Sequence, residues 1–200
     1  MRSRAAASVL RTAGFAAVHS MEGGMHAWQG LTAAGAPEAG MAFFTVDSLP
    51  EELIALAWVL EEGSRKFYAS VAGTRADSEA AKLFTELAAA EDHHKASLLG
   101  LYRDIANAEP GPDFPRGIIA AEEDRMEGGL KVREALAWAA GRDTRALLEL
   151  SMALETDSYD LYIKMGRRVP GEKAKRVFDH LVEEEKQHLS RMAALLGANL

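Results

Sequence analysis

The sequence predicts an all-α protein in which four long helices form a bundle with one long crossover. Helix-start and helix-stop signals divide residues 46–200 into four long segments joined by two short turns and one connection of about 38 residues. The second half of this region also repeats the first, because residues 145–200 align without a gap on 51–106 at 12 identical positions of 56. We therefore expect two antiparallel helical hairpins joined by the crossover.

The first hairpin is expected to begin at Ser48-Leu-Pro-Glu51, which has the spacing of a capping box with a proline in the first turn. Gly73 and the polar residues after it end the first helix. Asp77 or Ser78 can cap the second helix. The two helices are expected over about residues 48–71 and 77–106.

The crossover and the second hairpin follow from similar signals. Residues 108–117 are rich in proline and glycine and predict a loop, and a short helix is expected after Gly128-Gly129. Asp143 caps the next long helix, and Pro170-Gly171 turns the chain into the last one, with Gly197 beyond its end. These three helices are expected over about residues 132–140, 143–166 and 172–196. A bundle with one long crossover has the ferritin-like topology.

The repeat preserves residue types that bind metals. Two Glu-x-x-His triplets lie 94 residues apart, and each follows another glutamate 30 residues upstream. Because residues three apart share one face of a helix, both members of a triplet can reach the same metal. The upstream glutamates have matched acidic partners, whereas Glu62 aligns with Thr156, and Glu183 and Glu184 align with alanines. The six predicted ligands are Glu61, Glu91, His94, Glu155, Glu185 and His188.

Four carboxylates and two imidazoles on one bundle axis are typical of a di-metal site. These hard oxygen donors with imidazole suit two iron ions, with manganese as the alternative, and leave positions open for dioxygen or peroxide. A single Glu-x-x-His is often only a surface pair, but without metal four buried carboxylates would be costly to desolvate. Two such triplets at one offset therefore favour a metal site.

Tyr68 and Tyr162 lie seven residues beyond the upstream glutamates, two helical turns along the same face. Each phenol can donate a hydrogen bond to a ligand carboxylate. Alternatively, each is a core tyrosine with its hydroxyl at the rim. Their symmetric placement favours the first interpretation.

Composition excludes several kinds of function. The net charge of −7 and the pI near 5.4 argue against nucleic acid or an anionic membrane surface as partner. No apolar run is long enough to span a membrane, so a cytoplasmic location is expected. The absence of cysteine excludes disulfides, iron–sulfur clusters and cysteine-ligated metals, so any metal must be bound by carboxylate and imidazole.

The segment from Glu61 to Tyr68, followed by Phe84 to His94, resembles the rubrerythrin branch of the ferritin-like superfamily, and the second half repeats the resemblance. It covers about residues 46–200 and implies two irons held by the six ligands above, reduction of hydrogen peroxide, and a homodimer. The chain has no four-cysteine rubredoxin-like domain, so electrons must come from a separate donor such as a rubredoxin-like protein. Ser158 lies one turn after Glu155, where members of that family often have an extra carboxylate.

Two alternative functions remain open. The same ligands suit an iron-handling protein that oxidises iron without peroxidase turnover. A metal-free interaction bundle could instead present the acidic residues 183–185 and the charged residues 122–125 to a partner protein.

Residues 1–44 resemble the C-terminal end of a rhodanese domain, through Arg2-Ser3, Gly14 to Val18 and Glu22 to Trp28. This short α/β rhodanese-like remnant lacks the family's active-site cysteine, so sulfurtransferase activity does not carry over. We expect it to be mobile unless it packs on the bundle or on a second subunit. The bundle domain is expected over residues 45–200, after a linker rich in Gly, Ala and Pro.

Overall fold

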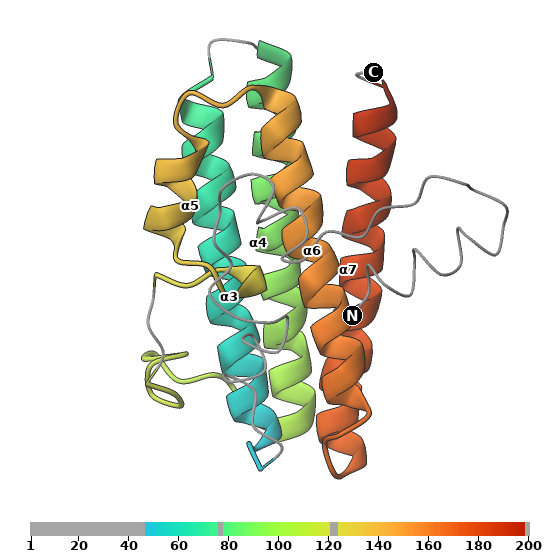
Figure 1. Ribbon diagram of the computed structural model, residues 1–200. Coiled ribbons are helices and arrows are strands. Elements are labelled where there is room, and N and C mark those ends of the chain that lie inside the picture. The colour runs from blue at the N-terminus through green and yellow to red at the C-terminus, as the bar shows by residue number, and fades with distance from the viewer. Residues whose placement is uncertain (1–46, 76–77, 121–123, 199–200) are drawn as a thin grey trace, which may run out of the picture. The chain divides into compact units, whose positions relative to one another are not determined.

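The computed structural model describes residues 47–75, 78–120 and 124–198, and within them it is all-α (Figure 1). The described part contains five α-helices, one short 3-10 turn and no strand. This confirms the expected helical bundle. The predicted rhodanese-like remnant lies outside the described residues. No helix in the described ranges has the length and hydrophobicity needed to cross a bilayer.

Two helical hairpins make the bundle. Helix α3 (Pro50–Gly73) packs along α4 (Ser78–Ala106), and α6 (Thr144–Gly166) packs along α7 (Glu172–Ala198). Helix α7 also contacts both helices of the first hairpin. The start of α3 and the turn between α6 and α7 lie at the same end of the bundle (Figure 1).

The helix boundaries agree closely with those expected, except at three ends. Helix α3 continues through Gly73, two residues past its expected end, and α7 continues past Gly197 to Ala198. The predicted capping box at Ser48 is wrong by one residue, because Leu49 is the N-cap and its N–H donates to Glu52 Oε2 at 2.8 Å. The physical reason is Pro50, which forces the preceding residue out of the helical region, so Leu49 is extended with ψ of 150°.

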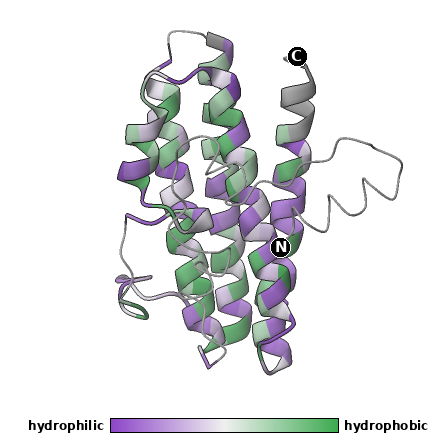
Figure 2. Ribbon diagram, in the orientation of Figure 1, coloured by the Kyte–Doolittle hydropathy of each residue, from purple (hydrophilic) through white to green (hydrophobic). Residues whose placement is uncertain are grey.

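A layer of apolar side chains fills the end of the bundle where α3 begins and α6 ends. Hydrophilic and hydrophobic residues alternate along all four long helices, as their amphipathic pattern requires (Figure 2). Residues of this layer from the four helices include Leu53, Ile54, Leu98, Ile105, Met165 and Phe178, each at most 2% exposed.

The crossover packs against both hairpins. It contains a short 3-10 turn, η2 (Glu127–Gly129), and the helix α5 (Val132–Ala139). Helix α5 contacts α3, whereas η2 contacts both α3 and α6. The approach to α3 requires glycine at position 63, because a Cβ there would overlap the carbonyl oxygen of Arg125.

Candidate metal centre

All four long helices contribute to a buried cluster of acids and histidines in the bundle. Each predicted ligand is at most 6% exposed, although glutamate is almost never fully buried unless it is paired. Glu61 comes from α3, Glu91 and His94 from α4, Glu155 from α6, and Glu185 and His188 from α7.

Glu91 lies between the two histidines. His94 Nδ1 is 3.0 Å from Glu61 Oε2 and 3.3 Å from Glu91 Oε2. His188 Nδ1 is 3.1 Å from Glu155 Oε2 and 3.6 Å from the other oxygen of Glu91, Oε1. The two imidazole rings are nearly perpendicular, with centroids 5.2 Å apart. The two oxygens of Glu91 thus face different halves of the repeat.

Glu185 has a similar position on the opposite hairpin. Its ligand atoms lie within 4.8 Å of those of Glu155 and His188, and it forms another such group with Glu61 and Glu127. Glu91 and Glu185 therefore adjoin both halves of the cluster, as bridging carboxylates would. Glu61 and Glu155 each adjoin one histidine, as terminal ligands would.

Many oxygens of the cluster have no hydrogen-bond partner, although buried polar atoms are normally satisfied. His188 Nδ1 and Glu155 Oε2 are 3.1 Å apart but do not form a hydrogen bond of acceptable geometry. Atoms that converge in this way without bonding to one another fit a shared cation. The unpartnered carboxylate oxygens are Glu61 Oε1, both oxygens of Glu91, Glu155 Oε2 and both oxygens of Glu185.

Burial and mutual repulsion dominate the electrostatics of the metal-free cluster. Burial, reinforced by neighbouring carboxylates, raises the pKa of Glu91 and of Glu185 well above the ordinary range. Burial alone would lower the pKa of His94, but the charge of Glu61 and its hydrogen bond outweigh this and raise it to about 9. Burial likewise opposes ionisation of Glu155, yet the neighbouring His188 lowers its pKa to about 2. The cluster thus holds protons that a metal ion could replace.

Both predicted tyrosines donate hydrogen bonds to buried carboxylates. The Tyr68 hydroxyl reaches across from α3 to Glu155 Oε1 at 2.6 Å. The Tyr162 hydroxyl reaches Glu127 Oε1 at 3.3 Å. Neither side chain is exposed to solvent, and burial together with the adjacent carboxylate raises the pKa of each phenol.

Glu127 is a buried carboxylate that sequence reasoning missed. It lies in η2, is 0% exposed, and its ligand atoms group with those of Glu61 and Glu185 and with those of Glu91 and Glu155. The repeat could not reveal it, because the crossover lies between the two segments that align, 51–106 and 145–200. The available signal was indirect: Ser64 and Ser158 are identical in the alignment and both contact the crossover.

Glu184, which the alignment of the two halves argued against as a ligand, also lies near the cluster. Its Oε2 lies 3.6 Å from His94 Nε2, the ring nitrogen that faces away from Glu61 and Glu91. The position equivalent to Glu184 in the other half is Ala90, and His188 Nε2 has no hydrogen-bond partner. The two histidines therefore have different surroundings. His93, next to His94, aligns with Gln187 and is exposed.

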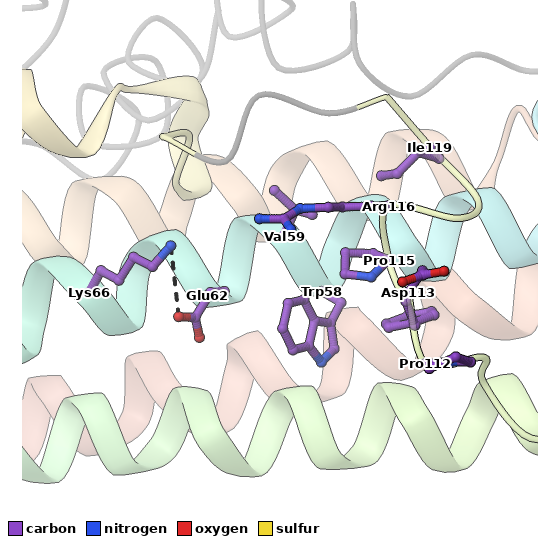
Figure 3. A pocket seen from close by; sticks show the side chains of 10 residues that line it. Trp58, Val59, Glu62, Lys66, Pro112, Asp113, Pro115, Arg116 and Ile119 are labelled. Carbon is purple, nitrogen blue, oxygen red and sulfur yellow. Dashed lines mark ion pairs between the residues drawn. The ribbon is translucent and has the colours of Figure 1, made fainter.

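A pocket of about 300 Å³ lies outside this cluster, between α3 and the crossover loop at residues 112–119. Figure 3 shows Trp58, Glu62 and Lys66 on α3, with Lys66 Nζ 3.9 Å from Glu62 Oε1. None of the residues that line this pocket is a predicted ligand.

A four-helix bundle with a Glu on each of two helices and Glu-x-x-His on each of the other two defines the di-metal carboxylate class of proteins. The family model described as rubrerythrin matches residues 52–196, and the chain belongs to this family. A hypothetical protein from Pyrococcus furiosus has a similar fold, with a TM-score of 0.54 and 23% sequence identity over 82% of this chain and 95% of that one. No curated protein matches the chain.

Proposed function

We propose that the protein is a di-iron oxidoreductase that reduces hydrogen peroxide with electrons from a separate donor protein. The observation that carries this proposal is the set of unpartnered carboxylate oxygens that converge with two histidines inside the bundle. Family membership supports the choice of reaction. The donor set accepts iron or manganese, since both prefer carboxylate and imidazole ligands.

In this proposal the metal pair would be held by Glu61, Glu91, Glu155 and Glu185 together with the two histidines. His94 and His188 would offer Nδ1, the nitrogen nearest the carboxylates in both residues. When bound, a pair of ferrous ions supplies the two electrons that peroxide reduction consumes.

The protein's own side chains orient this site and exclude water from it. The Tyr68 hydroxyl donates to one oxygen of Glu155, so the other oxygen, which has no hydrogen-bond partner, would be available to a metal ion. The phenols retain their protons at neutral pH, because burial and the adjacent carboxylates raise their pKa. Phe84 packs on Tyr68 and Phe178 packs on Tyr162, with ring centroids 6.4 and 6.3 Å apart. All four rings are fully buried.

The structure weighs against a metal-free interaction bundle. Without a metal, burying six carboxylate oxygens that have no hydrogen bonds would cost desolvation free energy that no interaction offsets. Iron oxidation without peroxidase turnover uses the same ligands, so it differs from our proposal only in the reaction.

Steady-state turnover separates these two reactions. Iron-loaded protein, supplied with NADH, a reductase and a rubredoxin, should consume NADH and hydrogen peroxide in equal amounts. Glu91→Gln should abolish this turnover, because it removes a bridging carboxylate. Glu134→Gln, an exposed substitution of the same kind in α5, should leave it unchanged. Ferrous iron oxidation by dioxygen without sustained NADH consumption would contradict the peroxidase and support iron handling.

A further inference from the structure

The crossover places a fifth carboxylate, Glu127, among the four that the helices supply. Its ligand atoms lie within 4.8 Å of those of Glu61 and Glu185, and it forms a second group with Glu91 and Glu155. Each group combines residues from both hairpins. No other carboxylate of the crossover among the described residues belongs to a potential metal-binding group.

We propose that Glu127 is a direct ligand of the di-metal centre, supplied by the crossover and not by a bundle helix. This inference rests on the proposed di-metal site. It adds a seventh protein ligand to the six that the repeat provides, and it predicts that the two metal positions are not equivalent.

The backbone around Glu127 packs closely against one helix of each hairpin, α3 and α6. A Cβ on Gly63 would overlap Arg125, and a Cβ on Gly128 would lie 2.6 Å from Leu154 Cδ2. Gly128 has φ of 69°, which favours glycine. Met126, next to Glu127, is completely buried. Glycine on α3 and glycine in η2 thus let the crossover come close enough to place its carboxylate inside the bundle.

Two serines at equivalent positions of the repeat anchor this segment. Ser64 Oγ donates to Glu127 Oε2 at 3.2 Å and accepts from the Glu127 N–H at 3.3 Å. Ser158 Oγ accepts from the Gly128 N–H at 3.2 Å. Position 158 therefore carries a serine and not an extra carboxylate, and this serine holds the backbone next to Glu127.

Ser64 and Tyr162 each donate a hydrogen bond to the Glu127 carboxylate from a neutral hydroxyl. Neutral donors of this kind do not balance the charge of a carboxylate buried beside four others. Two divalent cations at the centre of the cluster would offset four of the five negative charges that the ionised carboxylates carry. A purely structural role, in which Glu127 only fastens the crossover, is the competing explanation.

Glu127→Gln separates these explanations. Ser64 and Tyr162 donate to different oxygens of Glu127, so glutamine keeps one acceptor oxygen and can donate from its amide to the other hydroxyl, but it lacks the charge of a metal ligand. We would titrate ferrous iron anaerobically into the full-length protein by calorimetry and record Mössbauer spectra of protein loaded with 57Fe. We expect the affinity for one of the two irons to fall by about tenfold or more, and the Mössbauer spectrum of that iron to change.

Gly63→Ala provides a second test that removes no ligand. Its Cβ should displace the segment at Arg125 and with it Glu127, so it should weaken the same iron site. Combined with Glu127→Gln, it should cause no further loss of affinity. Glu134→Gln, an exposed substitution of the same kind in the crossover, is the matched control and should bind both irons as the wild type does.

Circular dichroism and thermal melting must first show that each variant is folded. If Gly63→Ala does not fold, Glu127→Gln alone decides. Wild-type protein with two irons, together with Glu127→Gln of equal affinity and unchanged spectrum, would overturn this inference and leave the proposed function intact. Wild-type protein that binds no iron would overturn both.

Discussion

At the scale of single residues, the two tyrosines show how an almost symmetric site becomes asymmetric. Tyr68 and Tyr162 occupy equivalent positions of the repeat, yet one donates to Glu155 of a helix and the other to Glu127 of the crossover. The shorter bond, at 2.6 Å, is in the range of charge-assisted hydrogen bonds to an ionised carboxylate. The phenols therefore hold different carboxylates in the two halves.

The buried acids should make the stability of the metal-free protein depend on pH. Burial, together with neighbouring carboxylates, raises the pKa of Glu91, Glu127 and Glu185 above their ordinary value of 4.5. Their contribution to stability is fully present below that value and is lost as the pH rises, because the folded state binds their protons more tightly. His94, with its pKa raised from 6.5 to about 9, acts in the same direction. We expect Tm to fall from about pH 5 to about pH 8 in circular dichroism melts.

Glu155 acts in the opposite sense but outside this range. Its pKa is lowered to about 2, so its contribution is lost only as the pH falls from 4.5 towards that value. Iron-loaded protein should show a smaller fall or a rise across the same range, because protons compete with the metal for its ligands. A Tm of the metal-free protein that increases with pH would be inconsistent with the burial of these acids.

At the scale of elements, two glycines within helices provide an opposed pair of predictions. A Cβ on Gly100 of α4 would meet nothing within 4 Å, whereas a Cβ on Gly63 of α3 would overlap the crossover. Gly100→Ala should therefore stabilise the protein by about 0.5–1 kcal/mol through helix propensity. Gly63→Ala should destabilise it, despite the same gain in propensity. Urea denaturation of the metal-free variants measures both changes, and equal effects would show that the crossover does not touch α3.

Local signals in the sequence predicted the helices well. Asp143, for example, is the N-cap of α6 and accepts a hydrogen bond from the Ala146 N–H at 2.8 Å, as expected from its position. The start of α3 was misplaced because Ser48 and Glu51 match a capping box by spacing, while the constraint that Pro50 places on Leu49 decides the boundary. Turn and cap chemistry is local, so a sequence can reveal it.

The contribution of the crossover could not be predicted in this way. Glu127 approaches the cluster only through long-range packing of η2 against α3 and α6, and no local pattern marks it. The buried cluster of acids and histidines on the four helices was predictable, because helix periodicity and the internal repeat together fix which residues share a face. Packing between segments that are distant in the sequence produces no comparable periodic pattern of residues.

At the scale of the whole bundle, stability and metal binding are partly separable. The apolar layer at the end where α3 begins contains none of the six predicted ligands. Its buried leucine, isoleucine and phenylalanine side chains should each contribute about 1.5–3 kcal/mol of burial free energy whether or not metal is bound. We therefore expect the metal-free bundle to stay folded and the metal centre to add stability by mass action.

The metal content of anaerobically purified protein tests the central claim most directly. Elemental analysis of the wild type, with a Glu91→Gln and His188→Ala double variant as the reference, should give about two irons per chain for the wild type and none for the variant. The oxidised wild type should also absorb in the near ultraviolet. No bound metal, a single zinc, or two irons retained by the double variant would contradict the assignment of a di-iron centre to these residues.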